Sequence, residues 1–331
     1  MSRPVSCPVD PAQRDELLAI CARTFQQPEP DGRLPRQFHR KTHACLRATL
    51  TVDPPEDPGV RHGLFARPGR YDALVRFSNS FFAEDNHPDL RGLAVKVMGV
   101  EGPVCDGAPP GQQDFVLMNA ETGPARDASE ALALFRALDG IRRATPFAVA
   151  APRYMFPSLL PWRARWRYFA FLSASSLRHL RGRDLAQLSY GSVTPYRLGD
   201  GAMKFALVPD IDARNRRPAK GKDLAGKLQA TLDKGPIRFD FRLQPRVLES
   251  DPMEDVRRAW HSPSVTVGRL EIPPQDVAAT VALGDRLTFA PWNCLSAHEP
   301  LGSINALRRA AYAASAANRG AEATAPPGCP G

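Results

Sequence analysis

Apolar and polar residues alternate along several short segments of the chain, a pattern typical of strands with one buried face. In residues 237–245, for example, Ile237, Phe239, Phe241 and Leu243 fall on one face. Glycine and proline punctuate the gaps between such segments, as they do between strands. Strands are therefore expected at residues 43–52, 71–80, 91–100, 113–119, 201–209, 237–245, 267–272 and 285–291.

Three other segments have the composition and spacing of helices. The first covers residues 15–24, and the second covers residues 127–140, between an N-cap-like Asp127 and a closing Gly140. The third, residues 304–319, is rich in alanine, which has the highest helix propensity. Because strands and helices do not alternate in βαβ order and no repeat is visible, we predict one strand-rich α+β domain around a sheet or barrel.

Composition narrows the class of protein. The chain has 331 residues, 43% hydrophobic and 24% charged, which excludes a wholly disordered or fibrous chain. The 33 prolines argue against a helical bundle. The net charge is +9, but the basic residues are mixed with acidic residues along the whole chain, so no nucleic-acid partner is expected.

The start of the chain has no apolar core of a signal peptide, and no run of 18 uncharged apolar residues occurs. None of the six cysteines form a C-x-x-C pair. We therefore expect a soluble cytoplasmic protein with reduced thiols.

The last predicted helix carries a tyrosine between two arginines. Arg308 and Tyr312 are one helical turn apart, and Arg319 returns to nearly the same face seven residues later. Nearby cations favour a phenolate, and a phenolate is a good hard ligand for ferric iron. The alternative is a tyrosine packed on the core with solvated arginines around it.

Two histidines lie four residues apart before the first strand. On a helix, His39 and His43 could bind one metal, with Cys45 as a third ligand. The β-branched residues that follow favour a strand, in which the two histidines lie about 13 Å apart and share no metal. A structural role is the alternative for each histidine.

Seven segments occur in the order found in the haem catalase family, and the chain resembles the short, catalase-related form of that family. These segments are RQFH (36–39), VRFSN (75–79), DLRGLAVKV (89–97), SYGS with MKFALV (within 189–208), VGRL (267–270), LTFAPWN (287–293) and RRAAY (308–312). The resemblance implies a catalase-like antiparallel β-barrel core with surrounding helices. It covers residues 34–319 as the haem domain, after an N-terminal arm (1–33) and before a disordered tail (320–331). Because only 19 residues follow Tyr312, the family's C-terminal helical domain is expected to be missing.

The resemblance also implies haem b as cofactor and assigns residues to it. Tyr312 would be the iron ligand, as tyrosinate, and Arg308 would hydrogen-bond the phenolate oxygen. Three further arginines match those that bind the haem propionates, namely Arg36, Arg76 and Arg319. Guanidinium groups suit this task because they pair with carboxylates through two parallel hydrogen bonds.

On the other side of the haem, His39 matches the distal histidine that takes a proton from peroxide and returns it. Ser78 matches the serine that fixes the histidine tautomer. The distal asparagine of the large catalases has no clear match, and only Gln112 or Gln113 could substitute. Phe38 stands where the large catalases have a small β-branched residue.

These assignments imply a peroxidase with weak catalase activity, acting on hydrogen peroxide or organic hydroperoxides with an unidentified electron donor. Rearrangement of fatty-acid hydroperoxides is one alternative, although Phe38 stands where those enzymes carry threonine. A haem-binding protein without turnover is another. A homo-oligomer is expected.

Residues 153–183 interleave aromatic and arginine residues and have no good counterpart in the family. They could form an amphipathic helix on a membrane surface, line an apolar channel for lipid hydroperoxides, or pack on the barrel with arginines outward.

Overall fold

The computed structural model describes residues 9–80, 84–86, 89–144, 184–210, 220–221 and 223–324. The aromatic and arginine-rich segment at 153–183 lies outside these residues, so its predicted roles stay predictions. In the described part of the chain, no helix is both long enough and apolar enough to cross a membrane.

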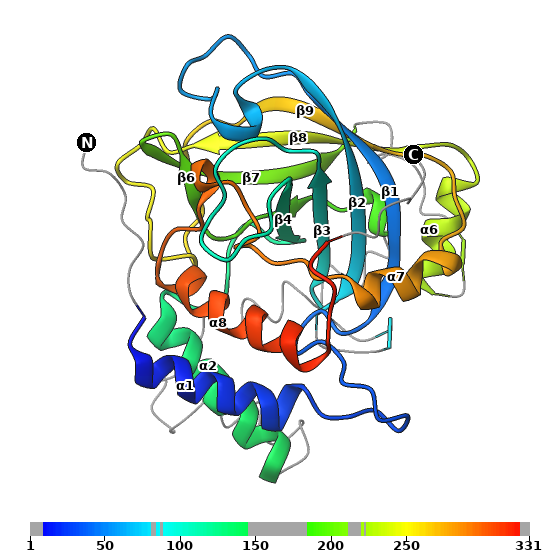
Figure 1. Ribbon diagram of the computed structural model, residues 1–331, viewed down its shortest axis with the longest axis vertical. Coiled ribbons are helices and arrows are strands. Elements are labelled where there is room, and N and C mark those ends of the chain that lie inside the picture. The colour runs from blue at the N-terminus through cyan, green and yellow to red at the C-terminus, as the bar shows by residue number, and fades with distance from the viewer. Residues whose placement is uncertain are drawn as a thin grey trace, which may run out of the picture.

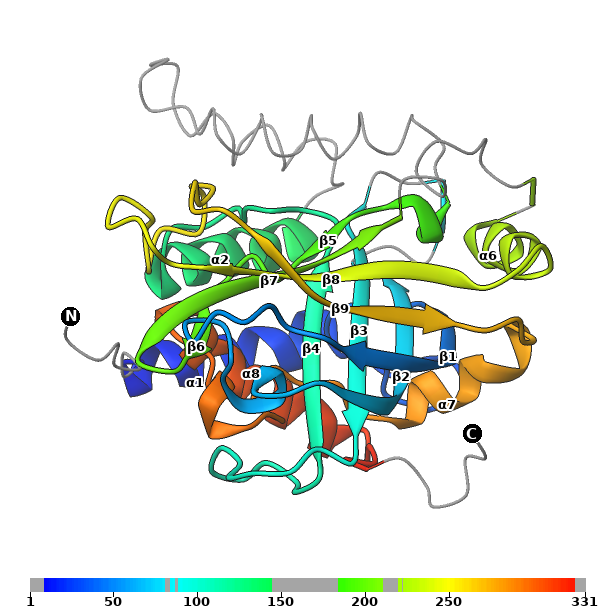
Figure 2. The ribbon, with the colours of Figure 1, turned by 90° about the horizontal axis from the view of Figure 1, so that it is seen from above.

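Eight antiparallel strands close into a barrel, which confirms the predicted fold class (Figure 1). Their order around the barrel is β5-β4-β3-β2-β1-β9-β8-β7, and β5 pairs back to β7; the short β6 also pairs with β7. The strands are β1 (Thr42–Val52), β2 (Gly69–Asn79), β3 (Arg91–Met98), β4 (Gln112–Met118), β5 (Tyr190–Gly191), β6 (Tyr196–Leu198), β7 (Gly201–Pro209), β8 (Ile237–Pro245) and β9 (Val265–Ile272). Figure 2 shows β7, β8 and β9 crossing the direction of β2, β3 and β4.

Alternation along the strands separates a filled barrel interior from an outer face. The four alternating residues of β8 that the sequence placed on one face are all at most 4% exposed and belong to the main core. Phe115 and Phe205 pack edge to face with ring centroids 5.0 Å apart inside this core. Because aromatic side chains fill the interior, any site for a large ligand has to lie outside the barrel wall.

The helices α1 (Pro11–Ile20), α2 (Ala128–Ala144) and α8 (Ser303–Asn318) pack together on one side of the barrel (Figure 1). Their shared cluster includes Leu17, Leu132 and Leu307, each at most 3% exposed. A π-helical turn (Cys21–Phe25) extends α1. Within the described residues the other helices are α6 (Leu224–Leu232), α7 (Val281–Arg286) and four short 3₁₀ turns (Gly63–Phe65, Leu185–Gln187, Ala278–Thr280 and Ser296–His298).

The predicted strand at residues 285–291 is wrong. Its start belongs to α7, and Leu287 makes only an isolated bridge. Leu287 and Phe289 are buried against the outer face of the barrel, which explains their apolar alternation. Among the described residues, the hydrogen bonds of this segment do not come from the backbone of a neighbouring strand of the barrel; the amide of Ala290, for example, donates to Asp114 Oδ2 at 2.9 Å.

The residues after α8 contact the barrel. The amide of Thr288 donates to the carbonyl oxygen of Glu322 at 2.7 Å, and Lys96 Nζ donates to the carbonyl oxygen of Ala323 at 3.3 Å. Glu322 and Ala323 belong to the predicted tail (320–331), of which residues 325–331 lie outside the described part of the chain.

Candidate functional site

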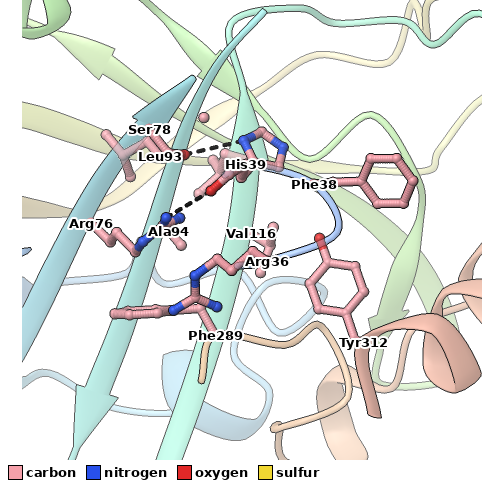
Figure 3. A pocket seen from close by; sticks show the side chains of 12 residues that line it. Arg36, Phe38, His39, Arg76, Ser78, Leu93, Ala94, Val116, Phe289 and Tyr312 are labelled. Carbon is pink, nitrogen blue, oxygen red and sulfur yellow. Dashed lines mark hydrogen bonds between the residues drawn. The ribbon is translucent and has the colours of Figure 1, made fainter. Parts of the chain in front are cut away.

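A pocket lies between the outer face of the barrel and α8 (Figure 3). In β2, Val75 and Phe77 face the core, so their neighbours Arg76 and Ser78 face outward. The loop before β1, the strands β3 and β4 and the helix α8 complete the walls. The lining residues are Arg36, Phe38, His39, Arg76, Ser78, Gly92, Leu93, Ala94, Val116, Leu117, Phe289 and Tyr312.

His39 is held firmly by its backbone. Its φ of 54° lies in the left-handed region, which is uncommon for a residue other than glycine. The amide of His39 donates to the carbonyl oxygen of Ser80 at 2.8 Å, and its carbonyl oxygen accepts from Arg76 Nη2 at 2.7 Å. Both backbone groups are therefore fixed, and the imidazole is held at the pocket wall.

The imidazole of His39 is positioned from two sides. Its Nδ1 lies 3.1 Å from Ser78 Oγ. A Cβ at Gly92 would lie 2.2 Å from Nδ1, so the imidazole occupies the space that a side chain would need there. Burial, together with the charges of nearby arginines, lowers the pKa of His39 to about 3. His39 is thus a neutral imidazole, able to accept a proton, at ordinary pH.

Tyr312 faces His39 across the pocket, and its phenol oxygen points into the pocket (Figure 3). Arg308, one turn earlier on α8, donates from Nη2 to this oxygen at 3.4 Å. Arg308 is held by Asn305 Oδ1 at 2.9 Å and Thr194 Oγ1 at 3.2 Å. Burial acts to lower the pKa of Arg308, but the Tyr312 and Tyr196 oxygens raise it overall, so this cation persists beside the phenol.

Three arginines gather at one end of the pocket around the start of β1 and the end of α7. Burial, as the largest cause, lowers the pKa of Arg36, Arg76 and Arg319, that of Arg76 to about 10. Mutual repulsion contributes to the lowering for the first two. Asp285 is the carboxylate that opposes this repulsion for each of them. The cluster therefore has more positive than negative charge.

The cluster also contains guanidinium donors that make no hydrogen bond among the described residues. Arg36 Nη2 donates to the carbonyl oxygen of Gly284 at 2.7 Å, and Arg319 Nη1 donates to that of Asp285 at 2.7 Å. The Nε atoms of Arg36 and Arg319 are buried and have no hydrogen-bond partner among the described residues. Unsatisfied guanidinium donors in a cationic cluster fit a ligand with carboxylates. The donor set therefore fits haem, with its two propionates at the arginines and a phenol oxygen for its iron.

The amide expected beside His39 is not at Gln112 or Gln113. Gln112 accepts from Lys96 Nζ at 3.2 Å, and Gln113 Oε1 accepts from the amide of Leu295 at 2.9 Å. These contacts lie at the far end of β4, because Met118, six residues along, pairs with Gly92 at the pocket. Among the described lining residues no side chain carries an amide.

Phe38 forms an aromatic part of the pocket wall. Its ring packs against Phe25 and Phe135, with centroids 5.0 and 5.2 Å away. The three rings join the pocket to the cluster formed by α1, α2 and α8. The pocket wall that Phe38 provides beside His39 is therefore apolar.

His43 and Cys45 are not among the residues that line the pocket. His43 Nε2 lies 2.7 Å from Asn79 Oδ1, and Cys45 is buried in a small apolar cluster on the outer face of the barrel. Within the described residues, no group of three His, Cys, Asp or Glu side chains could hold a metal ion.

The sequence missed the residues that support the arginines. Thr42 Oγ1 accepts from Arg76 Nη2 at 2.7 Å and donates to Asp285 Oδ1 at 2.5 Å. A register shift in β1 between Thr42 and Ala44 brings Thr42 opposite Ser78. The pattern of apolar and polar residues in the sequence does not predict this irregularity.

Comparison with known proteins finds a relative in sequence and solved structures of similar fold. No family model matches the chain. A catalase-related peroxidase of Mycolicibacterium paratuberculosis is 29% identical over 249 residues, which are 69% of this chain and 71% of the relative. A fungal catalase aligns with a TM-score of 0.62 and 16% identity over 86% of this chain, and a bacterial catalase with 0.56 and 15% over 95%.

The chain is similar in sequence to a catalase-related peroxidase, and its fold is similar to that of the two catalases. It spans 58% and 63% of the length of the two solved catalases. Of the seven site residues expected from the resemblance, five line the pocket: Arg36, His39, Arg76, Ser78 and Tyr312. Arg308 contacts Tyr312, and Arg319 adjoins the other arginines.

Proposed function

We propose that the chain is a haem-dependent oxidoreductase that reduces hydrogen peroxide or organic hydroperoxides. The observation that carries the proposal is one pocket with Tyr312 and Arg308 on one side and His39 with Ser78 on the other. The relative named catalase-related peroxidase supports the same activity.

The chain's own residues divide the work of holding the cofactor. Tyr312 would offer its oxygen to the haem iron, and Arg308 Nη2 would donate a hydrogen bond to that oxygen. Arg36, Arg76 and Arg319 would receive the propionates, which would satisfy the two buried Nε donors. Haem b, when bound, supplies the redox chemistry of peroxide cleavage.

His39 would move the proton. The neutral imidazole takes a proton from the near oxygen of a peroxide and returns it to the departing oxygen, which leaves as water or an alcohol. Ser78 fixes the orientation of the imidazole through Nδ1, and so directs Nε2 towards the pocket. Phe38, Val116 and Leu117 keep the surroundings of this transfer apolar.

The balance of activities favours peroxidase over catalase. A catalase has to hold a second hydrogen peroxide as its reductant, and polar groups beside the distal histidine do this. Among the described lining residues, His39 and Ser78 are the polar groups on that side, with no amide to assist. We therefore expect weak catalase activity and reduction by an organic donor.

The test is an absorption spectrum of the protein expressed with haem supply, before and after peroxide is added. We expect a Soret band of a high-spin ferric–phenolate type that shifts with peroxide. The variant Tyr312→Phe should lose or alter this ligation. The control Tyr71→Phe, at the opposite end of β2 from the pocket, should keep it.

Three other outcomes would each replace the proposal. A Soret band that ignores peroxide would indicate a haem-binding protein without turnover. Consumption of a fatty-acid hydroperoxide without any reductant, with a rearranged product, would indicate an isomerase. Absence of a Soret band would limit the likeness to catalases to the fold.

A further inference from the structure

Two cysteines outside the pocket form a close pair. The Sγ atoms of Cys105 and Cys294 are 3.5 Å apart, although the residues are 189 positions apart in the sequence. Cys105 is 7% exposed and Cys294 is fully buried. Cys105 lies in the loop between β3 and β4, and Cys294 lies in the segment that leads into α8.

The backbone holds the two thiols in register. Val104 and Leu295 form an antiparallel bridge, and the amide of Cys105 donates to the carbonyl oxygen of Cys294 at 2.9 Å. The amide of Ser296 donates to the carbonyl oxygen of Pro103 at 2.9 Å. The two cysteines therefore stand directly opposite each other, and a disulfide needs the sulfurs to approach by about 1.5 Å through small side-chain rotations.

The two sulfurs differ in reactivity. The thiol of Cys294 donates to Cys105 Sγ, and this hydrogen bond lowers the pKa of Cys105, with smaller contributions from Arg309 and Arg197. The same contact and burial raise the pKa of Cys294. Cys105 is thus the nucleophile of the pair. The side chain of the next residue, Asp106, is 96% exposed, so Cys105 lies just below the surface.

We propose that Cys105 and Cys294 form a redox-active pair that peroxides convert into an intramolecular disulfide. The Cys105 thiolate attacks a peroxide oxygen, the O–O bond breaks, and water or an alcohol leaves. Cys294 then attacks the resulting sulfenic acid and releases water. In total, two thiols and one peroxide give one disulfide, one water and one further water or alcohol. The reaction needs no haem, so it is independent of the proposed function.

The disulfide would fasten the β3–β4 loop to the segment that positions α8. One ion pair already links these parts, because Arg309 Nη2 of α8 lies 3.0 Å from Asp106 Oδ2. A covalent link at the same place ties the helix that carries Tyr312 to the barrel. Oxidation by peroxide would therefore stabilise the fold.

The experiment exposes the full-length purified protein to a small excess of hydrogen peroxide and then blocks the remaining thiols. Of six thiols, we expect two to be lost. Peptide mapping without reductant should show Cys105 joined to Cys294, and reductant should reverse the link. The melting temperature of the oxidised protein should rise by about 5–10 °C, because the link closes a long loop in the unfolded chain.

Variants sharpen the test. Cys294→Ser should abolish the link and leave Cys105 as a sulfenic acid that dimedone traps. The matched control Cys21→Ser removes a buried thiol in the cluster of α1, α2 and α8 and should leave the link unchanged. Retention of all six thiols, oxidation of Cys105 without a link, or a link to another cysteine would overturn the proposal. The mapping needs no spectrum, so its failure is distinct from failure of the haem proposal.

Discussion

The pKa of His39 makes the proposed acid–base step testable through its pH dependence. We expect the rate of the peroxide reaction to stay almost constant from pH 7.5 to pH 4.5. Burial is the largest cause of the lowered pKa of about 3, followed by the charges of Arg76, Arg308 and Arg36. A bound propionate would weaken the arginine contribution, but the apolar haem would preserve the desolvation.

The size of the effect follows from the pKa. With a pKa of about 3, about 97% of His39 is neutral at pH 4.5. With the ordinary value of about 6.5, only about 1% would be neutral, and the rate would fall about 100-fold over the same range. The two cases differ far more than the error of a rate measurement.

The assay is the second-order rate constant for peroxide, followed by the change in the Soret band in a stopped-flow instrument at constant ionic strength. The variant His39→Gln should react about 10²–10⁴ times more slowly at every pH, which identifies His39 as the group. Circular dichroism at each pH separates chemistry from unfolding. A tenfold fall in rate per pH unit below 6.5, with unchanged circular dichroism, would refute the reasoning.

Three further predictions concern buried groups. Lys96→Met should lower the free energy of unfolding by about 3–5 kcal/mol in urea titrations, because it leaves the buried carboxylate of Asp114, 2.8 Å from Nζ, without its cation. Burial lowers the pKa of His298 to about 4, so the unfolded chain binds an extra proton below pH 6.5 and stability falls as the pH falls towards 4. His298→Gln should remove about 2–3 kcal/mol of this loss between pH 7 and pH 4.5 in the same titrations. Gly92→Ala would place a methyl group 2.2 Å from His39 Nδ1, and should slow the peroxide reaction about 10²-fold while the Soret band of the resting protein is kept.

Local patterns predicted most of the fold. Alternation located β7 and β8 with the bounds that the structure shows, and it located the other long strands to within two residues. The same rule failed at residues 285–291, where Leu287 and Phe289 alternate into a core without a strand partner. Burial of one face produces the pattern whether or not a neighbouring strand supplies the hydrogen bonds. Strands of two or three residues, β5 and β6, are too short to show any period.

Some features of the candidate site were predicted from the sequence, and others were not. The motifs located Arg36, His39 and Tyr312, and the structure places all three at one pocket. The pair of Cys105 and Cys294 was invisible, because it joins segments that are distant in the sequence and have no shared motif. The suggestion of Gln112 or Gln113 failed for a geometric reason: six residues of extended strand, about 20 Å, separate Gln112 from the pocket end of β4.

The position of α8 along its axis determines whether the two sides of the pocket face each other. A shift of one residue would turn the helix by about 100° and remove Tyr312 from the pocket. The first turn is fixed by Glu254, which accepts from the amide and the hydroxyl of Ser303. Asn305 donates to the carbonyl oxygen of Pro195 at 2.9 Å, and at the other end Arg319 reaches the carbonyl oxygen of Asp285.

These contacts attach α8 to the segment between β5 and β6, to the loop between β8 and β9 that carries Glu254, and to the end of α7. The loop that carries His39 is also bonded to α8, because the amide of Gln37 donates to Ser315 Oγ at 3.3 Å, so the two sides of the site are linked. A substitution that removes the contact between Ser303 and Glu254 should weaken haem binding at Tyr312. It should leave the hydrogen bond between His39 Nδ1 and Ser78 Oγ intact. The site thus lies between the barrel wall and α8. The relative positions of its side chains depend on the hydrogen bonds that hold α8 as much as on the residues that line the pocket.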